Sequence, residues 1–169
     1  MSAEFSYTPA VLVLSDGRAF HGRSVGAAGE AVGVLRFNTA QTGSFEALTA
    51  EENADALLAF TTPHIGNTGV GDLAAKATVA GVIMRDPSRL ASHWDSQGEL
   101  EPYLIDNGVV AISHIDTRAL MRHAGANYRS DDAPVFAGIF TGDRARTPIT
   151  ELVEYIAETA KITSQQKGR

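Results

Sequence analysis

Two short stretches of this chain combine a histidine with other polar side chains, and each could do chemistry. In the first, His114-Ile115-Asp116, an extended backbone would place a histidine and a carboxylate on the same side, as a metal pair or as a general base with its orienting acid. Asp116 also stands directly before a helix-like run, where its carboxylate would accept a hydrogen bond from the backbone N–H of Arg118 or Ala119. The helix N-cap is the favoured interpretation, and we expect no metal site and no cofactor.

The second stretch is Thr62–Gly69, the most distinctive local string in the sequence. Pro63 fixes the backbone there, and Gly66 permits unusual φ angles. His64 and Asn67 would then project polar groups from a tight loop. Such a loop suits a ligand or a protein partner, but it could equally be a structural turn in which the asparagine satisfies its own backbone.

Two further residues could take part in binding. Arg85 follows the apolar run Val79–Met84, so its guanidinium could hold a carboxylate at the end of a strand, although an ion pair with Asp86 is the simpler role. Trp94 is the single tryptophan; it could anchor a partner or lie half-buried over a strand edge. The candidate partner- or ligand-binding residues are therefore His64, Asn67, Arg85 and Trp94.

The sequence shows no catalytic constellation. It has no cysteine, which excludes a thiol nucleophile, a disulfide scaffold and a cysteine-based zinc site. There is no His-Glu-x-x-His zinc motif, no phosphate-binding Gly-Lys-Ser/Thr loop and no Gly-x-Ser-x-Gly elbow. We therefore expect no catalytic residue in this chain.

Bulk composition narrows the class of protein further. The formal net charge is −6 and the 14 basic residues are scattered, which argues against nucleic-acid binding, because phosphate contacts need clustered Lys and Arg. The longest apolar runs are too short to cross a bilayer, and the N-terminus does not read as a secretory signal. We expect a cytoplasmic protein with one domain at residues 10–162, between flexible tails at 1–9 and 163–169.

The elements that position these residues are expected to be mostly strands in the first part of the chain and mostly helices in the later part. Asp16-Gly17 between two strand-like runs predicts a β-hairpin, for which we expect a type I′ turn. Further strands are expected at Val32–Phe37, Leu57–Thr61, Val79–Met84, Val109–Ser113 and Val135–Phe140. The apolar run before Thr61 could also be helical, because periodicity does not decide so short a segment.

Helices are expected at four places, with stop and start signals at several of them. These are Ser44–Leu48, Leu100–Asn107 before Gly108, Thr117–His123 before Gly125, and a last helix opened by Thr147-Pro148. In the last helix, Ile149, Leu152, Val153, Ile156 and Ala160 recur on one face. About seven strands and three or four helices in this order predict mixed α and β layers.

Several ordered segments resemble one known family. They include Phe37-Asn38-Thr39 with Thr42-Gly43, the Thr62–Gly69 string, Arg85-Asp86, Ile115-Asp116-Thr117-Arg118 and Gly138–Asp143. Together they resemble the N-terminal domain of the small, glutaminase subunit of carbamoyl phosphate synthetase, from about Ala10 to Asp143. The resemblance implies an α/β fold of the three-layer β/β/α "swivelling" type, with mixed sheets and three or four helices.

The same resemblance implies a non-catalytic interaction domain that docks on the large synthetase subunit, in arginine and pyrimidine biosynthesis. In that family a cysteine nucleophile sits in a second, C-terminal glutaminase domain, which would be a further partner if this chain is a fragment. A serine of the family that helps bind glutamine corresponds here to Glu52, whose carboxylate would repel that of glutamine. The alternative is a free-standing, divergent binding protein that kept the fold and binds another ligand or partner.

Overall fold

The computed structural model describes residues 7–38, 44–61, 75–85, 100–127 and 134–167. Within them it shows seven strands and four α-helices, in the mixed order expected. The strands are β1 Pro9–Leu14, β2 Ala19–Ser24, β3 Glu30–Asn38, β4 Leu57–Phe60, β5 Gly81–Ile83, β6 Val110–Ser113 and β7 Phe136–Thr141. The helices are α1 Ser44–Thr49, α3 Leu100–Asp106, α4 Thr117–Asn127 and α5 Ile149–Lys167, with 3₁₀ turns η1 at Glu51–Asn53 and η2 at Gly142–Arg146.

The strands close into one barrel in the order β1-β2-β6-β5-β4-β3-β7. Strands β3, β4, β5 and β6 run parallel to one another. The other pairs are antiparallel: β1 pairs with β2 and with β7, β2 pairs with β6, and β7 pairs with β3. The barrel therefore has one parallel stretch and one antiparallel stretch of wall. The expected three-layer β/β/α arrangement is not confirmed, because these strands form a single closed sheet.

Alternate residues of each strand fill the interior of the barrel. Leu12 and Leu14 of β1 belong to the same buried cluster as Ile112 of β6 and Ile139 of β7. Their neighbours along β1 face outward and join a different buried cluster. Because both faces of these strands are buried, the sequence reads as continuous apolar runs rather than as an apolar–polar alternation.

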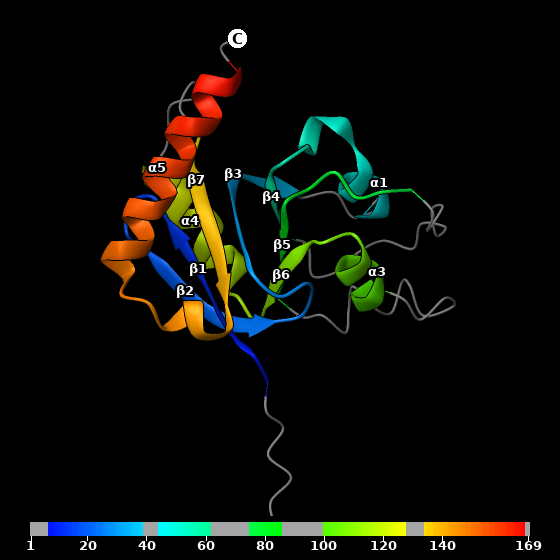
Figure 1. The fold of residues 1–169 in the computed structure, drawn as a ribbon, viewed down its shortest axis with the longest axis horizontal. Coiled ribbons are helices and arrows are strands. Elements are labelled where there is room, and N and C mark those ends of the chain that lie inside the picture. Colours follow the sequence, from blue (N-terminus) through cyan, green and yellow to red (C-terminus); the bar gives the residue numbers. More distant parts are fainter. Residues whose placement is uncertain (1–6, 39–43, 62–74, 86–99, 128–133, 168–169) are drawn as a thin grey trace, which may run out of the picture.

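Helices α1, α3 and α5 cover the outside of the barrel in two places, and a fourth helix, α4, packs against its core (Figure 1). The outer faces of β4, β5 and β6 pack with α1 and α3 through Leu48 and Leu104. The outer faces of β1 and β7 pack with α5 through Leu152 and Ile156, which confirms the predicted apolar face of that helix. Helix α4 contributes Leu120 to the interior cluster. The molecule thus has three buried clusters that share the barrel wall.

The first hairpin forms as expected, but its turn is of another type. Leu12 pairs with Phe20 across β1 and β2. The N–H of Gly17 donates to the carbonyl of Leu14 at 2.9 Å, and the φ of Gly17 is +95°, whereas Asp16 does not have a positive φ. This is a three-residue loop ending in a glycine bulge, so the type I′ prediction is wrong; both turns need glycine at this position.

Helix boundaries differ from expectation at two points. Helix α4 continues through Gly125, where we expected it to end, and reaches Asn127. Helix α5 begins at Ile149 and runs to Lys167, past the start of the expected C-terminal tail. Glycine lowers helix stability by roughly 1 kcal/mol but does not forbid a helix, and packing onto the barrel outweighs that cost in α4. The domain and tail boundaries stay predictions.

Candidate functional site

Four adjacent parallel strands end at the same edge of the barrel, which we call the carboxyl edge. The chain leaves β3 at Asn38, β4 at Thr61, β5 at Arg85 and β6 at His114. Backbone hydrogen bonds continue across these residues: the N–H of Thr61 donates to the carbonyl of Asn38 at 3.2 Å, and that of His114 donates to the carbonyl of Arg85 at 3.0 Å. In sheets with parallel strands, binding sites form outside the carboxyl ends of the strands.

The residues predicted to bind a partner belong to segments that leave from this edge. Residues 62–74 follow β4 and residues 86–99 follow β5, and these two strands are neighbours and parallel. His64, Asn67 and Trp94 lie outside the described residues, so their role stays a prediction. Arg85 is described and its side chain is exposed at the carboxyl edge. Its predicted ion pair with Asp86 also falls outside the described residues.

Arg85 and Asp116 are charged residues that the structure brings near each other at this edge. Asp116 ends the connection from β6 to α4, and its Oδ1 accepts the backbone N–H of Ala119 at 3.0 Å. That hydrogen bond lowers the pKa of Asp116 below its ordinary value; slight desolvation opposes it, and the positive charges of Arg85 and Arg122 add to it. The predicted N-cap is confirmed, with Ala119 as its donor.

The expected pairing of His114 with Asp116 on one side of an extended segment is wrong. His114 has a φ of +64°, in the left-handed region, which breaks the alternation of side chains. Its Nδ1 lies 2.7 Å from the hydroxyl of Ser113, whose side chain is buried. Among the described residues there is no group of three or more His, Cys, Asp or Glu that could hold a metal ion. The positive φ of His114 and the N-cap at Asp116 therefore shape the turn that leads from β6 into α4.

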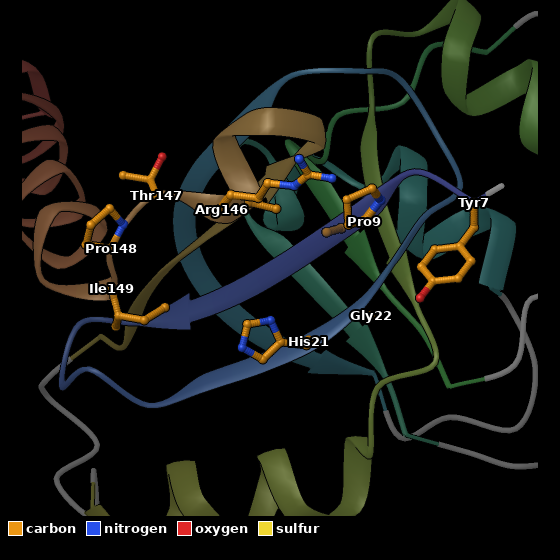
Figure 2. Close-up of a pocket in the computed structure, with 10 residues that line it drawn as sticks. Tyr7, Pro9, His21, Gly22, Arg146, Thr147, Pro148 and Ile149 are labelled. Carbon is orange, nitrogen blue, oxygen red and sulfur yellow. The ribbon is translucent and has the colours of Figure 1, made fainter.

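A second feature is a pocket of about 520 Å³ on the outer face of the barrel. It lies over β1, with Arg146 on one side and His21, from β2, on the other (Figure 2). Tyr7 stands at one end of the pocket, and Pro148 and Ile149 stand at the other. None of the ten residues that line it carries a carboxylate. The pocket thus combines two nitrogen-bearing side chains with mainly apolar walls.

Comparison with known proteins gives one consistent family. A sequence profile described as "Carbamoyl-phosphate synthase small chain, CPSase domain" matches residues 12–128. The chain belongs to this family. The carbamoyl phosphate synthase small chain of Bifidobacterium longum (strain NCC 2705) is 41% identical over 165 residues, covering 94% of this chain and 39% of that protein. That of Xanthomonas axonopodis pv. citri (strain 306) is 52% identical over 117 residues, covering 68% of this chain and 30% of that protein.

The match to these small chains covers only part of them. A third relative, the carbamoyl phosphate synthase small chain of Streptomyces coelicolor, is 42% identical over 150 residues, covering 87% of this chain and 38% of that protein. The chain thus spans about two fifths of the length of such relatives. Among solved structures, the aminopeptidase from Aneurinibacillus sp. strain AM-1 gives a TM-score of 0.41 at 14% identity, over 83% of this chain and 31% of that chain. A similarity this low carries no conclusion about fold or function.

One position bears on how this chain compares with its family. Glu52, which stands where the family resemblance places a glutamine-binding serine, lies exposed in η1. The backbone N–H of Ala54 donates to the carbonyl of Glu51 at the end of this short turn, and the side chain of Glu52 is exposed to solvent. Sequence analysis also missed the pocket, because its lining comes from β1, β2 and the start of α5, which only the barrel closure brings together.

No helix in the described part of the chain is long and apolar enough to cross a membrane.

Proposed function

We propose that this chain is a non-catalytic interaction domain of a glutamine-dependent carbamoyl phosphate synthetase, and that it docks on the large subunit of that ligase. The observation that supports this most is the family match over residues 12–128, together with relatives named as small chains of the synthase. A small chain implies a large partner chain. The pathway would be arginine and pyrimidine biosynthesis, and the glutaminase domain of a complete small subunit would be a second partner.

The absence of cysteine supports the non-catalytic part of this proposal. Amide hydrolysis by the family uses a cysteine thiolate, and this chain has no cysteine at any of its 169 positions. The exposed carboxylate of Glu52 also disfavours a glutamine carboxylate nearby. The chain by itself should therefore release no ammonia from glutamine.

The carboxyl edge is the surface we assign to docking. The segments that hold His64, Asn67 and Trp94 follow the neighbouring parallel strands β4 and β5 in the chain, and the exposed Arg85 lies just after β5. Arginine and tryptophan are common anchors of protein interfaces, and a stable interface buries about 1,600 Å² in total.

The test is to mix the chain with the large synthetase subunit from the same organism at micromolar concentrations and to follow co-elution on a sizing column. His64→Ala combined with Asn67→Ala should weaken the complex, and so should Arg85→Ala. Glu158→Ala is the matched control, because Glu158 is exposed on α5, which packs against β1, β3 and β7 and not against β4 or β5, the strands that precede the docking segments. Circular dichroism would confirm that each variant is folded.

Absence of any complex with a folded chain would refute docking by this domain. The alternative, a free-standing binding protein that kept the fold, would then lead. What favours that alternative is the departure at Glu52, because a serine-to-carboxylate change removes a family contact without affecting the buried core.

A further inference from the structure

The pocket over β1 is lined by an arginine, Arg146, and by no carboxylate, on a chain that is negatively charged overall. His21 projects outward from β2 and Arg146 precedes the start of α5, and both side chains are exposed. Neither side chain makes a hydrogen bond or ion pair with another residue in the described part of the chain. Arg144, two residues earlier, differs in this respect because it pairs with Glu30 at 3.1 Å. The charge in the pocket is therefore left available to a ligand.

A second arginine stands at one end of the pocket. The guanidinium of Arg23 lies 4.2 Å from the centre of the Tyr7 ring. Tyr7 is 56% exposed, which is unusual for an aromatic side chain of its size, and its ring lines the pocket. With Arg146 along one side, positive groups thus border the pocket at two places, whereas the chain as a whole carries a formal charge of −6.

The remaining walls are apolar. Pro9 of β1 lies between Arg146 and Tyr7, and Pro148 and Ile149 close the end opposite Tyr7 (Figure 2). A volume of about 520 Å³ falls in the range of small-molecule and side-chain pockets. An arginine guanidinium matches a carboxylate with two parallel hydrogen bonds, and apolar walls match a hydrocarbon or aromatic body.

We propose that this pocket binds a carboxylate attached to an apolar or aromatic body. Arg146 would hold the carboxylate, His21 would donate a hydrogen bond from the other side, and the rings of Tyr7, Pro9 and Pro148 would enclose the body. The carboxylate belongs to either a free organic acid or the end of a peptide, which share this chemistry. This site is independent of the docking proposed above, because it needs none of the residues assigned there.

The experiment titrates the ¹⁵N-labelled chain with phenylacetate and follows its amide signals by nuclear magnetic resonance. Saturable shifts are expected at residues around the pocket, such as Ala10, His21 and Ile149. Phenylacetamide, the uncharged analogue, should bind at least about tenfold more weakly, because it cannot form the charge-assisted pair. Inorganic phosphate should also bind more weakly, because it has no body to fill the apolar end.

A peptide distinguishes the two sources of the carboxylate. Acetyl-Ala-Ala-Phe with a free C-terminal carboxylate is compared with the same peptide carrying a C-terminal amide. Tighter binding of the free-acid peptide than of phenylacetate would identify a protein segment as the ligand, and the reverse would identify a small organic acid. Equal binding of the acid and amide forms of both probes would overturn the proposal.

Two variants of Arg146 test whether its charge binds the carboxylate. Arg146→Gln should weaken phenylacetate binding about tenfold, and Arg146→Lys should weaken it less, because lysine keeps the charge but loses the paired geometry. Arg36→Gln is the matched control, because Arg36 is an exposed arginine on β3 outside the pocket. Wild-type affinity in folded Arg146→Gln, or phosphate binding as tight as that of phenylacetate, would contradict the assignment.

Discussion

The two sides of the barrel hold their outer layers in place by different kinds of polar contact. On the parallel side, formed by β4, β5 and β6 with α1 and α3, neutral side chains bond to the backbone. The hydroxyl of Thr78 donates to the carbonyl of Ala50 at 2.6 Å, and the hydroxyl of Tyr103 donates to the carbonyl of Ala75 at 2.8 Å. These bonds tie the segment before β5 to α3 and to the end of α1.

On the antiparallel side, formed by β1, β2, β7 and the start of β3 with α4 and α5, charged side chains pair across long stretches of sequence. Asp16, in the β1–β2 turn, lies 2.7 Å from Nε2 of His123 on α4. Glu30 accepts from Arg144 at 3.1 Å and from the hydroxyl of Tyr155 at 3.2 Å. The guanidinium of Arg144 also stands 5.1 Å from the centre of the Tyr155 ring.

This difference predicts how each side responds to solution conditions. Neutral hydrogen bonds to backbone carbonyls depend little on salt or on pH between 4 and 9. Partly exposed charge pairs are screened by salt and depend on protonation. Apolar packing is common to both sides, so removing a buried side chain should cost a similar amount of unfolding free energy on either side. Removing a polar contact should cost less, and the dependence of that cost on salt and pH should differ between the two sides.

The largest expected effect is removal of a buried side chain on either side. Leu104 of α3 is 1% exposed and Phe140 of β7 is fully buried. Leu104→Ala should cost about 2–5 kcal/mol of unfolding free energy and Phe140→Ala about 3–5 kcal/mol, because each leaves a cavity. Urea unfolding followed by circular dichroism would measure both. A loss below about 1 kcal/mol for either variant would show that its side of the barrel does not take part in the cooperative core.

A smaller effect should distinguish the neutral bonds. Tyr103→Phe removes one hydrogen bond to the carbonyl of Ala75 and leaves the ring in place, so it should cost about 1 kcal/mol. The cost should be the same in 0.1 M and 1 M NaCl. Tyr155→Phe is the matched comparison, because its hydroxyl bonds to the carboxylate of Glu30, and its cost should change with salt. Equal salt dependence in the two variants would remove the contrast between the two sides.

The strands were predictable from sequence because their apolar runs are buried on both faces. The expected runs Val79–Met84, Val109–Ser113 and Val135–Phe140 became β5, β6 and β7, each within one or two residues of the expected bounds. The N-cap at Asp116 was also predictable, since it depends on residues only three apart. Local sequence decided these features.

Closure of the barrel and the pocket were not predictable in the same way. The pairing of β2 with β6 joins Arg23 to Ser113 across 90 positions, and no local pattern marks it. A Cβ on Gly22 would overlap with the carbonyl oxygen of Ser113, so this seam needs a glycine. The sequence pattern places Gly22 in a short strand but does not indicate that another backbone approaches it closely. The pocket depends on the same long-range closure.

The third prediction concerns the stability of the folded protein at acidic pH. Partial burial would raise the pKa of Asp16, but the backbone N–H of Arg18 and the imidazole of His123 outweigh it and lower the pKa below 3.8. A carboxyl group whose pKa is lower in the folded state stabilises the protein above its unfolded pKa, and this stability is lost as the pH falls. Wild type should therefore lose more stability than Asp16→Asn between about pH 5 and pH 3.

The measurement for this prediction is urea unfolding at a series of pH values. His123→Gln should reduce the acid dependence in the same direction as Asp16→Asn, because it removes the partner of the carboxylate. Tyr103→Phe is the control from the parallel side and should keep the wild-type acid dependence. Parallel stability curves for wild type and Asp16→Asn would show that the pair contributes nothing that depends on protonation.

The smallest effect belongs to Glu30 and Arg144. Their side chains are 36% and 41% exposed, so solvent screens their attraction, and an exposed pair of this kind contributes about 0.2–1 kcal/mol. Glu30→Gln keeps an oxygen that accepts from Arg144 and Tyr155 but removes the charge, so its cost should lie within that range at 50 mM NaCl. The cost should fall toward zero at 1 M NaCl, where the Debye length is about 3 Å. Thermal unfolding at the two salt concentrations would measure it. A cost that does not change with salt would mean that Glu30 acts through hydrogen bonds alone, as Thr78 and Tyr103 do, and the two sides of the barrel would then be held in place by the same kind of contact.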